Sequence, residues 1–196
     1  MNEAKGLLKL LGWKVENKIK DKMPPKAVVL SVPHTSLTDF FIGFFAYRNL
    51  GLKAHFLIKK EAFVFPFKKL LYRWGGIPVN RGKKSNIIQE IVNEFNTKDE
   101  FLLTITPEGS RSPRPRWKDG YHRIAKAANV PVLIGYIDYK TKSIGIEEIY
   151  KLQGDAAYDT VQIMKYYIGM EGRNPEKFVL PKEVYESAKK DNVAKS

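Results

Sequence analysis

Apolar residues recur along this chain with two periods, one typical of helices and one typical of buried strands. In residues 2–20 and 84–96 they fall on one helical face, with charged residues mostly elsewhere. Residues 26–32 (KAVVLSV) form a short continuous apolar run, which is typical of a strand buried on both faces. Similar patterns predict further strands over 53–58, 101–105, 131–139 and 143–149, further helices over 37–49, 119–129 and 155–168, and a loop with a short helix within 63–74.

The alternation of these elements predicts the fold class. It favours an α/β fold, a single domain with a central mostly parallel or mixed sheet flanked by helices. We divide the chain into an amphipathic N-terminal helix (1–22), the main domain (23–181) and a charged C-terminal tail (182–196) that is expected to fray. Sites in such sheets gather at the carboxyl ends of strands, so polar clusters directly after strands are the candidates for chemistry.

Composition narrows the classes of protein. A length of 196 residues with 43% hydrophobic content suits one compact domain. The absence of cysteine excludes disulfides, a thiol nucleophile and a cysteine-ligated zinc site, and it fits a reducing cytoplasm. No apolar stretch reaches the roughly 20 residues of a spanning helix, and no signal peptide is recognisable, so we expect a soluble or peripheral protein.

The formal net charge of +13 favours an anionic partner. Nucleic acid, anionic lipid, phosphorylated metabolites and an acidic carrier protein all fit this charge, which alone does not choose among them.

A first polar cluster, residues 33–39, follows the predicted strand 26–32 and contains the pattern H-x-x-x-x-D. His34 has the residue type of a general base for a hydroxyl, and Asp39 could orient its ring and stabilise the imidazolium. The spacing of Ser36 and Asp39 also resembles a capping box at a helix start. The pattern alone supports both interpretations equally.

Two more clusters carry cationic or flexible groups. Residues 75–84 combine glycines with Arg81 and two lysines, which suits phosphate binding, but the segment taken alone favours an exposed basic turn. Residues 106–112 (TPEGSRS) directly follow the predicted strand 101–105 and suit an anion and hydroxyl site or, alternatively, an ordinary turn. Residues 130–135 read simply as a buried strand.

In this order the four segments resemble the glycerolipid acyltransferase family, typified by the 1-acylglycerol-3-phosphate acyltransferases. The family's H-x-x-x-x-D block corresponds to His34 and Asp39, and its G-x-[IF]-x-[VI]-x-R block to residues 75–81. Its P-E-G-[ST]-R-S block corresponds to residues 107–112, and its V-P-[IV] strand to residues 130–132. The resemblance covers about residues 27–138 and implies a glycerol-phosphate acyltransferase-like fold.

The resemblance also implies roles. The hydroxyl of a lysophosphatidic-acid-like acceptor would attack an acyl thioester directly, with His34 as general base and Asp39 as its orienting partner. The substrate-binding residues would be Arg81 on the acceptor phosphate, together with Glu108, Gly109, Ser110 and Arg111. No metal and no cofactor are implied, and the thioester co-substrate would be acyl-coenzyme A or an acylated acyl carrier protein. The reaction belongs to phospholipid biosynthesis, so the protein is expected in the cytoplasm, peripheral at the anionic inner face of the cell membrane.

Three departures from the family pattern leave the acceptor open. Pro33, Asn80 and Thr106 stand where the family commonly has Asn, Asp and Phe. A second hypothesis keeps the chemistry but uses a lyso-aminolipid hydroxyl as acceptor. A third, suggested by the basic residues 111–118 around Trp117, is a non-catalytic module that binds anionic lipid or nucleic acid. We rank it last and do not expect nucleic acid as a partner, because a simple binder does not need His34 and Asp39 beside a P-E-G block.

Overall fold

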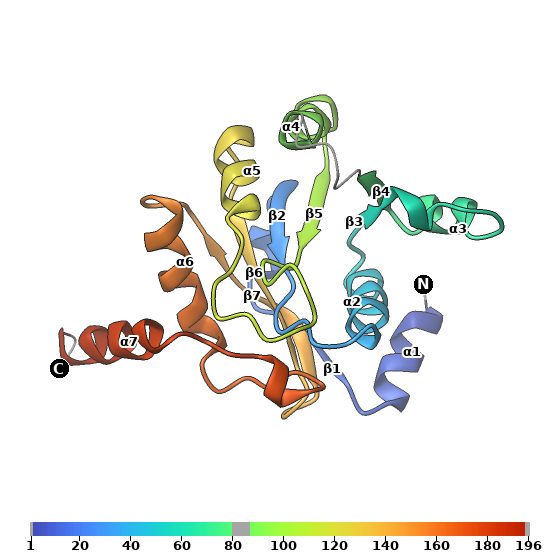
Figure 1. Ribbon diagram of the computed structural model, residues 1–196. Helices are drawn as coiled ribbons and strands as arrows, with labels where there is room; N and C mark the ends of the chain where they lie inside the picture. Colours follow the sequence, from blue (N-terminus) through green and yellow to red (C-terminus); the bar gives the residue numbers. More distant parts are fainter. Residues whose placement is uncertain (1, 80–86, 195–196) are drawn as a thin grey trace.

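The computed structural model describes residues 2–79 and 87–194, whose strands form one seven-stranded sheet (Figure 1). The strands are β1 (Lys14–Asn17), β2 (Lys26–Leu30), β3 (Ala54–Lys59), β4 (Gly76–Val79), β5 (Phe101–Ile105), β6 (Val132–Asp138) and β7 (Ser143–Tyr150). Their order is β1-β7-β6-β2-β5-β3-β4, and every neighbouring pair is parallel except β6 and β7. The predicted α/β class with a mostly parallel, mixed sheet is confirmed.

Helices cover both faces of the sheet. They are α1 (Asn2–Leu10), α2 (Thr38–Asn49), α3 (Lys68–Arg73), α4 (Ile87–Thr97), α5 (Gly120–Ala128), α6 (Ala156–Met164) and α7 (Lys182–Ala194). Alternate residues of β2 point to opposite layers, as the two-residue period of a strand requires. Val28 and Leu30 pack with α4, α5, α6 and α7, whereas Ala27 and Val29 pack on the side of α2. Burial on both faces explains why β2 reads as a continuous apolar run.

The predicted helix over 2–20 is wrong beyond Leu10. Gly12 lies in the left-handed region (φ +77°), a conformation that ends helices. Residues 14–17 then form β1, which pairs in parallel with β7 at the edge of the sheet. The misleading signal is the spacing of four between Leu11, Val15 and Ile19, because four residues are close to one helical turn and also a multiple of the strand period.

Two further elements differ from the predictions. The C-terminal segment, expected to fray, forms α7, and its Val184 is fully buried in the main core. The segment 76–79, interpreted from the sequence as part of a turn, forms β4 at the opposite edge of the sheet from β1. Pro78 obscures it in the sequence, and an edge position is where a strand tolerates proline.

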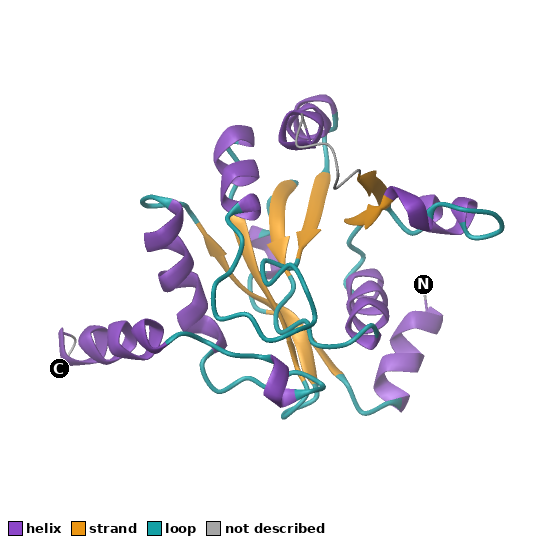
Figure 2. Cartoon of the chain, in the orientation of Figure 1, coloured by secondary structure: helices purple, strands orange, loops and turns teal. Residues whose placement is uncertain are grey.

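The sheet register brings the polar clusters together. Leu30 of β2 lies opposite Ile105 of β5, so the loops after these strands begin side by side. β6 flanks β2 on its other side in the same direction, so its carboxyl end reaches the same edge. Figure 2 shows loops gathered at the ends of β2 and β5. None of the helices within residues 2–79 and 87–194 has both the length and the hydropathy of a membrane-spanning segment.

Candidate active site

The loop after β2 holds His34 against Asp39. It starts with the buried residues Ser31 and Val32, passes a cis bond between Val32 and Pro33, and leads into α2 at Thr38. The His34 Nδ1 atom lies 3.6 Å from the Asp39 Oδ2 atom. No described residue hydrogen-bonds the other ring nitrogen, Nε2, and one fifth of the His34 side chain is exposed. The histidine therefore presents one nitrogen to a carboxylate, while the other has no hydrogen-bond partner among the described residues.

Asp39 serves both interpretations that the sequence left open. Its Oδ2 accepts hydrogen bonds from the backbone N–H groups of Thr35 and Ser36, both at 2.7 Å, as a helix-start carboxylate does. Its Oδ1 accepts a 2.6 Å hydrogen bond from the hydroxyl of Tyr139. Three donors thus hold a carboxylate that is only 1% exposed, and the same Oδ2 faces His34. The oxygen that caps the loop is therefore also the carboxylate oxygen that lies 3.6 Å from the His34 ring.

The protonation state of His34 suits a base. Burial lowers its pKa, the Asp39 carboxylate opposes that effect, and the Arg111 guanidinium lowers the pKa further. With its pKa below the ordinary 6.5, the imidazole is mostly neutral near pH 7 and has a free lone pair. A neutral imidazole beside a carboxylate can take a proton and have the resulting charge stabilised.

Glu108 connects the loop after β5 to the His34 loop. Both of its carboxyl oxygens accept from the His34 backbone N–H, at 2.9 and 3.2 Å, and the residue is 4% exposed. Burial raises the pKa of Glu108 to about 8, although the His34 N–H opposes the shift. The side chain is therefore largely protonated at neutral pH. Its contacts position the histidine, which the sequence did not indicate.

The rest of the P-E-G block forms a tight loop. Gly109 has φ +66°, a backbone conformation that favours glycine. A Cβ atom there would lie 2.7 Å from Cε of Lys118, the flexible end of a side chain that can move aside. The Ser110 hydroxyl accepts from Arg114 Nε at 3.0 Å and from the backbone of Ser112, which stabilises the loop. Arg111 is exposed and close enough to His34 to influence its pKa. Of this block, Arg111 has no ion pair with another described residue, and its charge acts on His34.

The other predicted site residue, Arg81, lies outside the described residues, as does Asn80. The strand that precedes them, β4, ends at Val79 and runs parallel to β3.

The structure adds residues that sequence reasoning missed. Tyr139 directly follows β6, so the rule that sites gather at strand ends could have found it. The segment 171–174 packs on the His34 loop from far along the chain: Asn174 donates through its backbone N–H to Thr35 Oγ1 and through Nδ2 to the Thr35 carbonyl. Arg173 donates to the Thr38 hydroxyl. No local pattern signals a contact across 139 positions.

The remaining histidines serve packing. His122 is buried and pairs with Asp159 at 2.9 Å, and Asp159 also accepts from Tyr150. His55 stacks against Phe101 with ring centroids 4.6 Å apart. Within residues 2–79 and 87–194 there is no group of three or more His, Asp or Glu side chains that could hold a metal ion.

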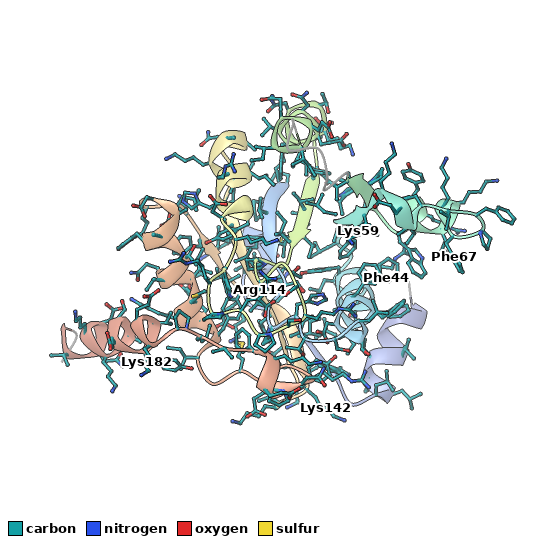
Figure 3. All side chains as sticks on the ribbon, in the orientation of Figure 1. Phe44, Lys59, Phe67, Arg114, Lys142 and Lys182 are labelled. Carbon is teal, nitrogen blue, oxygen red and sulfur yellow. The ribbon has the colours of Figure 1, made fainter. Side chains whose placement is uncertain are left out.

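A large cavity lies beside α2, about 1010 Å³ in volume. Its wall combines aromatic residues of α2 with residues of β3 and the end of α3, including Phe44, Tyr72 and Trp74. The rings of Phe44 and Trp74 are 5.0 Å apart, and Phe40 and Phe41 continue this aromatic layer toward the start of α2. Figure 3 shows Phe44 at this helix. The cavity therefore lies along the C-terminal half of α2, where its wall also includes Arg48, and the aromatic layer connects it to the first turn of the helix.

A protein-family model described as Acyltransferase matches residues 14–135, well over half of the chain. The chain belongs to the acyltransferase family. The matched segment contains both His34 and Glu108, and the resemblance inferred from the sequence blocks is confirmed at the level of the family. A comparison with curated proteins gave no match.

A solved structure agrees with the fold of this acyltransferase. The crystal structure of the 1-acyl-sn-glycerophosphate (LPA) acyltransferase PlsC from Thermotoga maritima superimposes with a TM-score of 0.52 at 19% sequence identity. The match covers 97% of this chain and 75% of that chain. At this identity the likeness establishes the shared fold.

Proposed function

We propose that this acyltransferase moves a fatty acyl chain from a thioester to the hydroxyl of a lysophosphatidic-acid-like acceptor in phospholipid biosynthesis. The observation that carries the proposal is the His34 ring, with Nδ1 beside a buried carboxylate and Nε2 without a hydrogen bond to any described residue. The lipid acceptor is supported by the resemblance of the sequence blocks to glycerolipid acyltransferases. It is also supported by the structural neighbour PlsC, a 1-acyl-sn-glycerophosphate (LPA) acyltransferase.

In the proposed reaction Nε2 of His34 takes the proton of the acceptor hydroxyl. The hydroxyl oxygen attacks the thioester carbonyl carbon and forms a tetrahedral intermediate. The C–S bond then breaks, and the thiolate leaves with the proton from the imidazolium, so the base is regenerated. A suitably placed base contributes about 10²–10⁴-fold, and holding alcohol and thioester together supplies much of the remaining acceleration.

We assign anionic groups of the substrates to the cationic side chains near the histidine. Arg111 is exposed and electrostatically coupled to His34, and it is the described candidate for the acceptor phosphate. The sequence pattern assigns Arg81 to the same phosphate. Glu108 would hold the His34 loop, and its neutral form would avoid repelling the phosphate.

We place the acyl chain in the cavity beside α2. Its volume of about 1010 Å³ and its aromatic wall suit a long alkyl chain, and the aromatic layer leads from the cavity toward the first turn of α2. The donor is coenzyme A or acyl carrier protein. Both are anionic and match the net charge of +13.

Identification of the product by mass spectrometry tests this assignment. The protein is incubated with palmitoyl-coenzyme A or palmitoyl acyl carrier protein and an equimolar mixture of lysophosphatidic acid and a lyso-aminolipid. We expect phosphatidic acid as the main product. A diacylated aminolipid as the main product would reject the acceptor but keep the chemistry, and no acylated product with either donor would favour the non-catalytic binding module.

A further inference from the structure

The chain between β3 and β4 projects from the domain as an aromatic arm, which we define as residues 60–73 and which includes α3 (Figure 1). Three apolar side chains of the arm are more than half exposed: Val64 (56%), Phe65 (94%) and Phe67 (59%). Figure 3 shows Phe67 at the outer part of this arm, away from the sheet. Single exposed apolar residues are common, but a group of them on one projecting segment marks an interaction site.

Basic residues surround this apolar tip. Lys60, Lys68, Lys69 and Arg73 of the arm are exposed, as is Lys59 just before it, and Glu61 is the single acidic residue in the range. Aromatic side chains that enter the boundary between headgroups and acyl chains, flanked by Lys and Arg that contact anionic headgroups, are typical of segments that lie in a membrane interface. A bilayer with anionic lipid complements both the apolar and the charged parts of the arm.

We propose that the aromatic arm docks on an anionic lipid bilayer, with Phe65 and Phe67 inserted into the interface and the flanking lysines on the headgroups. The base of the arm supports this orientation, because Tyr72 and Arg73 line the cavity beside α2. Docking through the arm brings that cavity to the surface from which a lipid chain enters. The inference rests on the proposed function, which explains why the protein would bind a membrane. The binding itself is measured without any acyl-transfer reaction.

Helix α1 contributes a second contact on the same flank. Leu7 lines the same cavity as Tyr72, and Leu10 and Leu11 are more than half exposed. The arm differs from α1 because its aromatic residues are flanked by several basic residues. The proposal therefore assigns the larger share of the binding to the arm.

Flotation with vesicles tests the proposal. Wild-type protein is mixed with phosphatidylcholine vesicles containing or lacking 30% phosphatidylglycerol. We expect binding to the anionic vesicles and a more than tenfold lower partition coefficient for the double variant Phe65→Ser/Phe67→Ser. The control variant Tyr158→Ser/Tyr185→Ser removes two exposed aromatic residues from α6 and α7 and should bind like the wild type.

Charge reversal tests the lysines in the same assay. Lys68→Glu/Lys69→Glu should weaken binding strongly. Lys189→Glu/Lys190→Glu, which makes the same change at exposed positions of α7, should weaken it much less. Thermal unfolding followed by circular dichroism shows whether each variant is folded.

Insertion is measured with a single fluorophore, because the chain contains no cysteine of its own. Phe65→Cys is labelled with a polarity-sensitive dye, and Tyr185→Cys carries the same dye as control. We expect a blue shift on anionic vesicles at position 65 only.

The docking would be overturned by absence of wild-type binding to anionic vesicles or by a dye at position 65 that stays in water while the protein binds. Binding that is lost in Leu10→Ser/Leu11→Ser but kept in the arm variant would also overturn it. A Phe65→Ser/Phe67→Ser variant that dissociates a dimer but still binds vesicles would likewise show a protein interface instead. Transfer between short-chain soluble substrates should persist in the arm variants. If the wild type shows no transfer between these substrates, the proposed function is rejected, but the measured binding to vesicles is unaffected.

Discussion

Asp39 receives hydrogen bonds from two backbone N–H groups and from the Tyr139 hydroxyl, and it faces His34 with the same oxygen that caps the loop. The proximity of His34 and Asp39 could be predicted from the sequence because they share one short segment after a strand. Tyr139 was harder to identify as a site residue, because Asp39, to which it donates, is 100 positions away in the sequence. The contact of Glu108 with the His34 backbone could not be predicted either, since a P-E-G pattern does not show that the carboxyl group accepts from that N–H group.

Tyr139→Phe tests whether the tyrosine positions Asp39. The change keeps a ring for the contact with Trp13, whose centroid is 4.9 Å away, and removes only the hydroxyl. We expect kcat to fall about tenfold with KM nearly unchanged, because an imperfectly held carboxylate supports the base less well. Tyr136→Phe is the matched control. Tyr136 lies in β6, three residues before Tyr139, and its hydroxyl donates a 2.6 Å hydrogen bond to Glu16 instead of Asp39. Equal kcat losses in both variants would contradict a positioning role for Tyr139.

Glu108→Gln tests the protonation of the buried carboxyl group. Its pKa is about 8 in the folded protein and near 4.5 ordinarily, so between these values the folded state binds more protons than the unfolded state. This contribution to the free energy of unfolding is fully present below about pH 4.5 and is lost as pH rises through about 8. Urea unfolding at several pH values should show a decline from pH 5 to 8 in the wild type and a weaker one in Glu108→Gln. The exposed Glu176→Gln should keep the wild-type decline, and identical slopes in all three proteins would refute the assignment.

At the scale of elements, the structure follows the hydrophobic pattern where one period dominates. β5 matches its prediction residue for residue, because a short apolar run directly before a polar cluster has clear ends. α1 and β1 were misjudged because a spacing of four fits both periods. α7 was missed because its buried Val184 is one apolar position in a charged segment. The burial of Val184 depends on contacts with distant segments of the core, which a local pattern does not show.

Gly172→Ala tests the contact between the segment 171–174 and the His34 loop. A Cβ atom at this position would lie 2.5 Å from Cγ2 of Thr35, so the segment must move and its hydrogen bonds to Thr35 weaken. We expect a loss of about 1–3 kcal/mol in the free energy of unfolding, together with lower kcat. Gly120→Ala, where a Cβ atom meets nothing within 4 Å, should leave both values near the wild type. Unchanged unfolding and kcat in Gly172→Ala would show that the segment does not support the site.

Leu52→Trp tests the cavity beside α2 as the acyl-chain site. Leu52 lines the cavity beyond the end of α2, away from the first turn that carries Asp39. A larger side chain there should lower kcat/KM for long-chain donors by at least tenfold and leave short-chain donors nearly unaffected. The short-chain donor is the internal control for folding and for the base. An equal loss for all chain lengths would place the acyl chain elsewhere.

At the scale of the whole molecule, the sheet order explains why separate sequence blocks act together. β5 and β6 flank β2, so the loops that follow the three strands meet at one edge. Alternation of strand and helix patterns was enough to predict the fold class. The strand order was not predictable from local patterns, because pairing depends on contacts between distant segments. Family membership, shown by the match over residues 14–135, adds the reaction class that the fold alone does not define.

The most direct test of the central claim is acceptor-dependent thiol release from palmitoyl-coenzyme A by wild type and His34→Ala. The protein has no cysteine, so it adds no thiol background. We expect release that requires lysophosphatidic acid in the wild type, and at least a 10²-fold lower rate in a folded His34→Ala variant. Full activity in that variant would contradict the account, because the acyl transfer would then proceed without His34 as its base.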